Sequence, residues 1–313
     1  MLTKHFGECF KPNAMVLTES GWKTLEDVNV GENVLTLNTS TNDIEIQPIL
    51  RKVVKDWDGD LIRIHNMNIN DEVTPNHEYL LYDDESNAYK GKFTASDIME
   101  GKVPRQNHSY IPRKGNWIGR NDEFFTIPNV SYSDGFKQDS LKEKYDSDLK
   151  IPMNTFAKFM GIYLSEGHCS KDERGSLVCI TQKKKAVVDD IKSLMDELGL
   201  KYVMKEKPKT EQSTIPTYMF IIYDLRLCKY LQQFGKCYEK FIPFELKQQN
   251  KEILRLFYDW FVKGDGRIRG DQRDESKKDK LTDDVFSTSK RMVLDLNEIQ
   301  LKIGYARKLS RGK

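Results

Sequence analysis

The sequence lacks closely spaced cysteines. It has five cysteines in 313 residues, an odd number, with no C-x-x-C pair. A disulfide framework needs cysteines that can pair, and structural zinc sites use closely spaced ones. The set therefore argues against both, and it favours a reducing, cytoplasmic environment in which thiols stay reduced.

Long apolar segments are also lacking. No stretch approaches the roughly 18 apolar residues that a membrane helix needs. The first eight residues do not have the apolar core of a secretory signal. We therefore expect no membrane partner. Hydrophobic residues still make up 38% of the chain, and its length suggests two folded domains.

A strong net charge is the third feature that is missing. The chain has 50 Lys and Arg against 48 Asp and Glu, which gives +2. Composition alone thus does not indicate nucleic-acid binding. Local basic runs occur, such as 183–185, and each is either a solvated helix face or part of a DNA-binding face on which charges are segregated.

Residues 9 to about 100 consist of short apolar runs separated by polar turns. Asp43–Gln47 alternates apolar and polar residues, as half-buried strands do, and Asp58-Gly59-Asp60 is typical of a turn. Many short strands with polar turns predict a compact all-β domain over 9–104. The expected strands lie at 15–18, 33–37, 44–54, 61–65 and 78–82.

The character of the chain changes after about residue 101. Prolines, scattered Lys and Arg, and a polar stretch from 131 to 150 follow one another. This composition predicts a connector over 105–150 with little core of its own.

From residue 151 the apolar spacing becomes helical. Two segments, 156–164 and 254–262, place apolar residues at i, i+3, i+4, i+7 and i+8, which is one face of a helix. The helices end in an acid followed by glycine, Glu166-Gly167 and Asp265-Gly266. After each acid come a strand, one or more lysines and a second helix. The expected strands are 176–181 and 284–287, and the expected second helices are 187–198 and 292–303.

This repetition predicts an α+β domain over 151–313 with pseudo-two-fold symmetry. Its tandem units would span 151–245 and 250–313. The second unit is shorter, and we expect it to be incomplete in this chain.

The N-terminal segments resemble a known family. Cys9–Thr18, Gly21–Val28, Gly31–Leu35 and Thr74-Pro75-Asn76-His77 are similar to the first two motifs of inteins. The resemblance implies a horseshoe-like Hint splicing domain, an N–S acyl shift at Cys9 without a cofactor, and residues 1–8 as a flanking host-protein segment.

The chemistry can also be argued from the residues. The shift needs a thiol placed against the carbonyl of Glu8, and a histidine such as His77 can protonate the leaving nitrogen. Thr74 and Asn76 could orient that ring or donate to the developing oxyanion. Outside such a motif, a single cysteine or histidine is more often inert, and we interpret the other four cysteines as packing residues.

The C-terminal half resembles a second family. Phe159–Gly167 and Tyr258–Gly266 are similar to the LAGLIDADG motif of homing endonucleases, and Lys240–Pro243 matches the Lys-x-x-Pro element of that family. Trp260 departs from the pattern, because it stands where Gly161 is the counterpart. The resemblance implies cleavage of double-stranded DNA at a homing site.

Two packed helices of this kind would bring Glu166 and Asp265 together. Close carboxylates repel each other and favour divalent cations, so we expect a Mg²⁺ site there. Lys185 and Lys290 occupy matching places in the two units. They are candidate DNA-phosphate contacts, or else ordinary lysines at helix starts.

The two resemblances together predict a large intein with an inserted endonuclease, in a bacterial, archaeal or phage-encoded context. The tail 302–313 holds neither the histidine nor the asparagine of a C-terminal splicing segment. We therefore expect splicing to need such a segment in cis or in trans, the chain being truncated, naturally split or decayed. Two alternatives stay open: a free-standing endonuclease with a DNA-binding N-terminal domain, and a Hint domain that processes itself without splicing.

Overall fold

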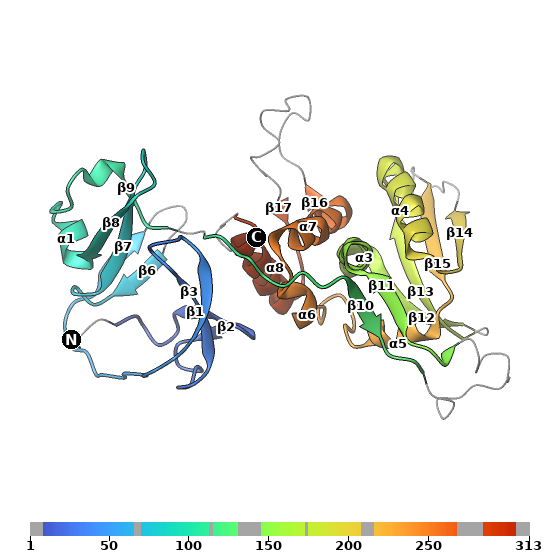
Figure 1. Ribbon diagram of the computed structural model, residues 1–313, viewed down its shortest axis with the longest axis horizontal. Helices are drawn as coiled ribbons and strands as arrows, with labels where there is room; N and C mark the ends of the chain where they lie inside the picture. Colours follow the sequence, from blue (N-terminus) through green and yellow to red (C-terminus); the bar gives the residue numbers. More distant parts are fainter. Residues whose placement is uncertain are drawn as a thin grey trace. The chain divides into compact units, whose positions relative to one another are not determined.

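The computed structural model describes residues 9–65, 70–112, 115–130, 145–172, 175–207, 216–267 and 284–304. The chain divides into two compact units (Figure 1). Unit 1 comprises Met1–Ile118 with Asn297–Lys313, and unit 2 comprises Gly119–Leu296. Within the described ranges, no helix is both long and apolar enough to cross a membrane.

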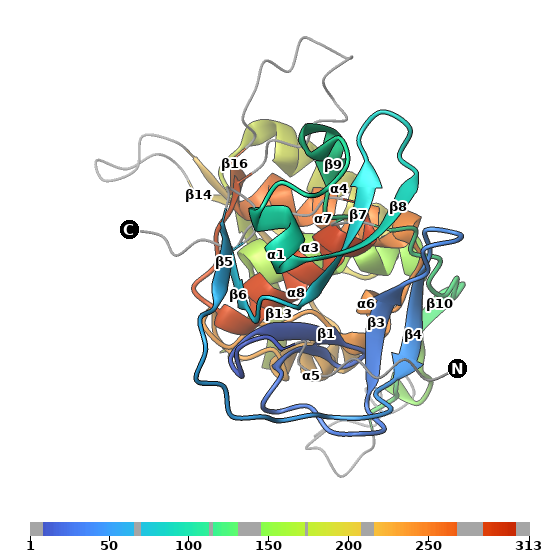
Figure 2. The ribbon, with the colours of Figure 1, turned by 90° about the vertical axis from the view of Figure 1, so that its left-hand side faces the viewer.

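Unit 1 begins with a four-stranded antiparallel sheet in the order β2-β1-β3-β4, of which Figure 2 labels β1, β3 and β4. A tight turn joins the first two strands, and Thr18 Oγ1 donates a 2.7 Å hydrogen bond to the Gly21 carbonyl across it. Gly21 has a φ of 118°, a backbone conformation that favours glycine. The strands are β1 (Met15–Thr18), β2 (Gly21–Thr24), β3 (Asn33–Leu37) and β4 (Ile44–Pro48).

Two smaller sheets follow, one with the order β5-β6 and one with the order β8-β7-β9. Their elements are β5 (Ile62–His65), β6 (Asn70–Val73), β7 (Glu78–Asp83), β8 (Tyr89–Thr94), α1 (Ala95–Met99), η1 (Gln106–His108) and β9 (Ser109–Tyr110). The core that they share consists of Val73, Tyr79, Leu81, Ala95 and Val103.

The five predicted strands of this region are found, one of them shorter than expected, and four further strands, β2, β6, β8 and β9, were not predicted. The strand expected over 44–54 ends at Pro48, which has no N–H to donate to a neighbouring strand, and Leu50 and Val54 beyond it are exposed. The helix α1 interrupts what was expected to be an all-β region. Thr94 and Asp97 form a capping box there, which satisfies the first backbone N–H groups of the helix.

The expected connector over 105–150 is divided between the two units. Its second part holds β10 (Phe124–Ile127), which pairs with β11 (Leu149–Pro152). Phe125 stacks on Phe156 with ring centroids 3.8 Å apart, and Ile127 is buried. This segment therefore contributes core side chains to unit 2.

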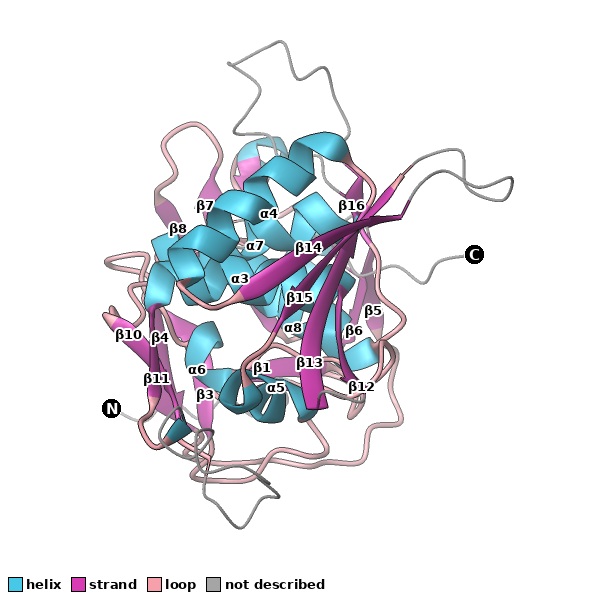
Figure 3. Cartoon of the chain, turned by 90° about the vertical axis from the view of Figure 1, so that its right-hand side faces the viewer, coloured by secondary structure: helices cyan, strands magenta, loops and turns pink. Residues whose placement is uncertain are grey.

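Unit 2 is built around a four-stranded antiparallel sheet in the order β12-β13-β15-β14 (Figure 3). Val178, Ile180, Phe220 and Ile222 alternate along its central strands and are fully buried. The helices α3 and α4 pack on β13, and α5 packs on β12 and β13. The elements are α3 (Met153–Glu166), β12 (Gly167–Asp172), β13 (Gly175–Gln182), α4 (Lys185–Leu198), β14 (Tyr202–Lys207), β15 (Thr217–Ile222) and α5 (Leu225–Gln232).

The helix–strand order of the first repeat returns in the second. Its elements are α6 (Phe244–Lys247), α7 (Lys251–Asp265), β16 (Gly266–Arg267), β17 (Asp284–Val285) and α8 (Lys290–Lys302). The helices α3 and α7 pack along each other, so the two repeats meet at this helix pair. The strand expected over 284–287 is confined to β17, and the helix expected over 292–303 begins two residues earlier.

Candidate functional site

Cys9 lies beside the turn that contains the second N-terminal motif. The Cys9 amide donates a 3.1 Å hydrogen bond to Thr74 Oγ1, and the Thr74 amide donates a 3.1 Å bond to the Cys9 carbonyl. Phe10 forms an antiparallel bridge with Val73, so the chain around Cys9 adds to the end of β6. Glu8 lies outside the described residues.

His77 lies in the same cluster. Its ring meets the Phe10 ring edge-on at a centroid distance of 4.2 Å and the Tyr79 ring at 5.0 Å. Its Nδ1 atom is buried, and no hydrogen-bond partner for it is found in the described part of the chain. Burial lowers the pKa of His77, which favours the neutral ring. Asn76 lies in the same turn and is exposed.

In unit 2, two glycines let α3 and α7 approach closely. A Cβ atom on Gly161 would lie 2.5 Å from the Phe257 carbonyl oxygen and 2.8 Å from Trp260 Cβ, and one on Gly264 would lie 2.7 Å from Ser165 Cβ. Trp260 therefore does not hold the helices apart, because Gly161 leaves room for it.

The acid–glycine ends of the two helices have a steric cause. Gly167 and Gly266 both leave the helix in an extended conformation, and a Cβ on either would lie within 2.7 Å of a carbonyl of the preceding turn. Glycine thus allows each chain to pass directly from helix to strand. Glu166 and Asp265 are the last residues of the two helices.

The Asp265 carboxylate acts on the Glu166 carboxylate. Burial raises the pKa of Glu166, and the negative charge of Asp265 raises it further. Burial also raises the pKa of Asp265, while Lys240 and Lys184 lower it. Gln182 Nε2 donates a 3.3 Å hydrogen bond to Glu166 Oε1, which orients that carboxylate.

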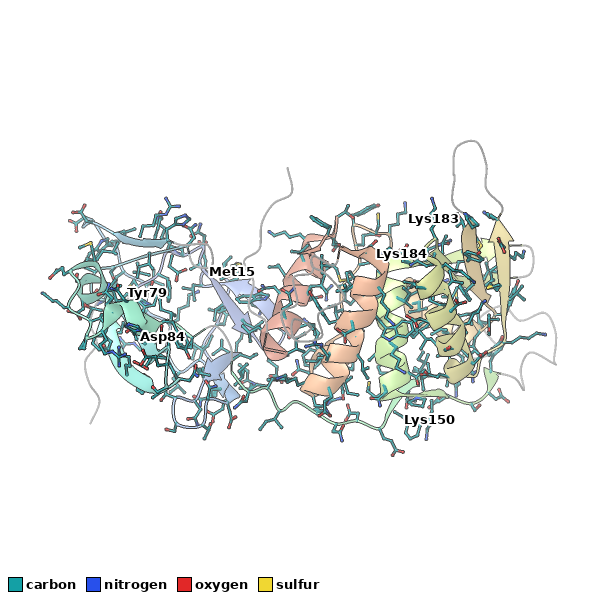
Figure 4. All side chains as sticks on the ribbon, turned by 90° about the horizontal axis from the view of Figure 1, so that it is seen from above. Met15, Tyr79, Asp84, Lys150, Lys183 and Lys184 are labelled. Carbon is teal, nitrogen blue, oxygen red and sulfur yellow. The ribbon has the colours of Figure 1, made fainter. Side chains whose placement is uncertain are left out.

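Two lysines cap the C-terminal ends of these helices. Buried Lys240 Nζ donates to the carbonyls of Tyr163, Leu164 and Gly167 at 2.8–3.1 Å. Lys184 Nζ donates to the carbonyls of Lys263 and Gly264 at 3.1 and 2.8 Å. Figure 4 labels Lys184 next to Lys183. Positive charge at a helix C-terminus is favourable, and here it lies next to the two acids.

Residues 154–235 match a family model described as the LAGLIDADG-like domain. These residues form a LAGLIDADG-like domain. The matched range contains Glu166, Gln182 and Lys184, whereas Lys240 and Asp265 lie beyond it.

Two curated proteins are similar to nearly the whole chain. An ATP-dependent Clp protease proteolytic subunit of Chlamydomonas moewusii is 24% identical over 320 residues, which cover 96% of this chain and 28% of the relative. An uncharacterised protein of Methanocaldococcus jannaschii is 23% identical over 322 residues, which cover 95% of this chain and 37% of the relative. The chain thus spans well under half the length of these relatives.

Solved structures of homing endonucleases are similar to parts of the chain. I-WcaI bound to its DNA recognition sequence is 18% identical, with a TM-score of 0.34, and covers 53% of this chain and 74% of its own. I-DmoI in complex with DNA and Mn is 15% identical, with a TM-score of 0.26, and covers 37% of this chain and 63% of its own.

The lysines predicted as DNA contacts lie at helix starts. Lys185, in the LAGLIDADG-like domain, is exposed and lies 3.3 Å from Asp189 in an i,i+4 ion pair. Lys290 is exposed at the first residue of α8. Their contact with DNA stays a prediction.

Sequence reasoning did not include Lys184, Lys240 or Gln182 in the site. The first was visible only as part of a basic run, and the second only as the lysine of the Lys-x-x-Pro element. Both lysines could therefore be noticed in the sequence. Their carbonyl partners could not, because these partners are brought close only by the tertiary fold.

Proposed function

We propose that unit 2 hydrolyses phosphodiester bonds of double-stranded DNA at a specific site, as a homing endonuclease does. The observation that carries this proposal is the pairing of Glu166 and Asp265 at the adjacent ends of α3 and α7. The LAGLIDADG-like match over 154–235 supports it.

The residues present suit a divalent cation. The Asp265 charge raises the pKa of Glu166, so the ionised pair carries unfavourable repulsion that Mg²⁺ would relieve. Glu166 and Asp265 would hold the ion, and a bound ion would supply Lewis-acid stabilisation of the phosphate. Gln182 orients Glu166, while Lys184 and Lys240 hold the helix ends that carry both acids.

The endonuclease proposal is tested by cleavage of a plasmid library that carries randomised duplex sites. The chain, alone and with a C-terminal segment supplied in trans, is incubated with Mg²⁺ or with EDTA, and the new ends are captured and sequenced. We expect cutting at a restricted set of sequences only with Mg²⁺, and its loss in Glu166→Gln and Asp265→Asn. Glu252→Gln, an exposed acid at the opposite end of α7, is the matched control and should cut normally.

Cutting that survives either substitution at Glu166 or Asp265, or that proceeds in EDTA, would contradict the assignment. Lys185→Ala and Lys290→Ala examine the predicted phosphate contacts. Each should weaken DNA binding across sequences and lower its salt dependence. An unchanged salt dependence would assign these lysines to the helix starts alone.

We also propose that unit 1 carries out an N–S acyl shift at Cys9, as in an intein. The observation that supports this proposal is the hydrogen bond from the Cys9 amide to Thr74 Oγ1. His77 packs beside Phe10, the residue after Cys9. In this step the neutral His77 ring takes the proton of the Cys9 thiol, and Cys9 Sγ attacks the Glu8 carbonyl carbon. The C–N bond breaks as the thioester forms, and His77 passes the proton to the leaving nitrogen.

The acyl-shift proposal is tested with a reporter protein in place of residues 1–8. Hydroxylamine should release the reporter from the native chain and not from Cys9→Ala. Equal release from both would contradict the proposal. Complete splicing would further require the flanking host segments and a C-terminal intein segment, supplied in cis or in trans.

The products of the reporter experiment distinguish splicing from the two alternatives, a self-processing Hint domain and a free-standing endonuclease. Release without ligation when such a segment is supplied would favour a Hint domain that processes itself. DNA binding by unit 1 without any acyl shift would favour a free-standing endonuclease. A reduced Cys9 thiol is required in the first case and in splicing, which fits a cytoplasmic setting.

A further inference from the structure

Two cysteines that neither proposed reaction uses lie together in unit 2. Cys169 is on β12 and Cys228 is on α5, which packs against that strand. Cys169 Sγ lies 3.7 Å from the Cys228 carbonyl oxygen, and the Cys228 side chain is the largest influence that lowers the pKa of Cys169. All five cysteines lie in the described part of the chain and carry reduced thiols.

We infer that Cys169 and Cys228 form a thiol–disulfide exchange site whose oxidant is a small-molecule disulfide such as oxidised glutathione. The site is independent of the endonuclease and acyl-shift proposals, and its failure would leave both unaffected.

The two thiols differ in a way that assigns their roles. Cys169 is half-buried and Cys228 is fully buried, so Cys169 is the more accessible of the two residues. Tyr163 Oη lies 3.3 Å from Cys169 Sγ, and the Lys240 charge also acts on this thiol. Hydrogen bonding from Cys228 and Tyr163, with the Lys240 charge, lowers the pKa of Cys169 to about 7. The accessible thiol is thus also the better nucleophile near neutral pH.

The exchange balances in two steps. The Cys169 thiolate attacks one sulfur of oxidised glutathione, which forms a mixed disulfide and releases one glutathione thiolate. The Cys228 thiol then loses its proton and attacks Cys169 Sγ. The protein disulfide forms and the second glutathione leaves. The protein loses two hydrogens, and one glutathione disulfide becomes two glutathione thiols.

The buried Cys228 thiol has contacts on two sides. Cys228 Sγ is 3.7 Å from the Leu177 carbonyl oxygen and 3.9 Å from Gln232 Nε2, which are long contacts. Cys179 is a useful contrast, because it is buried on β13 opposite His168. We expect Cys179 to stay reduced.

The test uses the full chain with Cys9→Ala and Cys237→Ser, which remove the half-exposed and exposed thiols outside the pair. The protein is equilibrated with oxidised glutathione, quenched by alkylation and mapped by mass spectrometry without reduction. We expect a single Cys169–Cys228 cross-linked peptide that dithiothreitol reverses. Cys228→Ser should stop at glutathione on Cys169, and Cys169→Ser should leave Cys228 unmodified.

Cys179→Ser is the matched control, and it should form the cross-link as the parent does. Circular dichroism on each variant checks that it is folded, and Cys228→Ala replaces Cys228→Ser if the hydroxyl unfolds the chain. Persistent glutathione on Cys169 in the parent, or a cross-link that involves Cys179, would overturn the inference. So would alkylation of both thiols after prolonged oxidation.

Discussion

Gly161 of α3 lies against Trp260 of α7 so closely that one added methyl group would come within 2.8 Å of Trp260 Cβ. The small residue on one helix and the large one on the other thus form a complementary pair. The contact influences how near Glu166 and Asp265 can come, because Glu166 ends α3 and Asp265 ends α7.

Gly161→Ala should therefore destabilise unit 2 by about 1–3 kcal/mol, the usual cost of overpacking a core. The methyl group would meet the Phe257 backbone as well as the Trp260 side chain, and backbone cannot move aside cheaply. Amide hydrogen exchange of α3 measures the effect. Lys192→Ala, at a half-exposed position of α4, serves as control and should change stability by less than about 0.5 kcal/mol. Equal protection in the two variants would show that the helices can separate freely.

Lys240→Met should destabilise the C-terminal end of α3. The substitution keeps the apolar stem but leaves the carbonyls of Tyr163, Leu164 and Gly167 without this donor. Losing a donor to buried carbonyls costs about 1–3 kcal/mol. Lys184→Met, at the exposed cap of α7, is the comparison and should cost less. Denaturant unfolding of both variants measures the difference, and the reverse order would contradict the role given to burial.

Glu166→Gln and Asp265→Asn should each stabilise the metal-free protein and remove its response to Mg²⁺. The repulsion that contributes to the raised pKa of Glu166 disappears when either charge is neutralised. The chain with both acids should gain thermal stability as Mg²⁺ is added, because the ion binds the folded state. Differential scanning calorimetry in EDTA and in Mg²⁺ measures both effects. A Mg²⁺-dependent rise that persists in both variants would place the ion elsewhere.

The sequence was informative where the signal is local. The apolar spacing of α3 and α7 and the glycines after Glu166 and Asp265 are visible in single segments, and they predicted the helix pair. The caps by Lys184 and Lys240 were not predicted, because their carbonyl partners are far away in the sequence. The same holds for Cys169 and Cys228, which were interpreted as packing residues because nothing in their spacing indicates that α5 covers β12.

Segments without a strong pattern were interpreted less well. The strands β12, β14 and β15 were not identified individually, because their pairing in one sheet is a tertiary property. Phe125 and Ile127 lie in a stretch with prolines and many polar residues, which favoured a connector. Their burial depends on β11 pairing with β10 and on Phe156 stacking from α3.

The stability of unit 1 should decrease on acidification partly because of His77. Burial lowers the pKa of His77 in the folded chain, so the unfolded state binds the proton more readily between the two pKa values. The His77 contribution to stability is therefore present above the unfolded pKa of about 6.5 and is lost as pH falls below it. Asp71 works in the opposite direction, since burial raises its pKa. Unfolding curves from pH 8 to about pH 5 give the free energy of unfolding of the parent and of His77→Gln. The difference between the two free energies isolates the contribution of the histidine. A difference that does not change with pH would contradict this account.

Finally, Thr74→Val should slow thioester formation at Cys9 while leaving the fold intact. Valine keeps the shape of threonine but removes the oxygen that accepts the Cys9 amide, so the peptide bond before Cys9 loses its anchor. His77→Ala should slow the same step by roughly 10²-fold or more, which is the usual scale for a lost acid–base group. Hydroxylamine release of an N-terminal reporter gives the rates, and alkylation of Cys9 checks that its thiol remains available. Thr41→Val, in an exposed turn of unit 1, is the control.

If Thr74→Val and His77→Ala both release the reporter at the parent rate, the contacts among Cys9, Thr74 and His77 serve packing alone. If only His77→Ala is slow, proton transfer limits the step and the amide anchor does not.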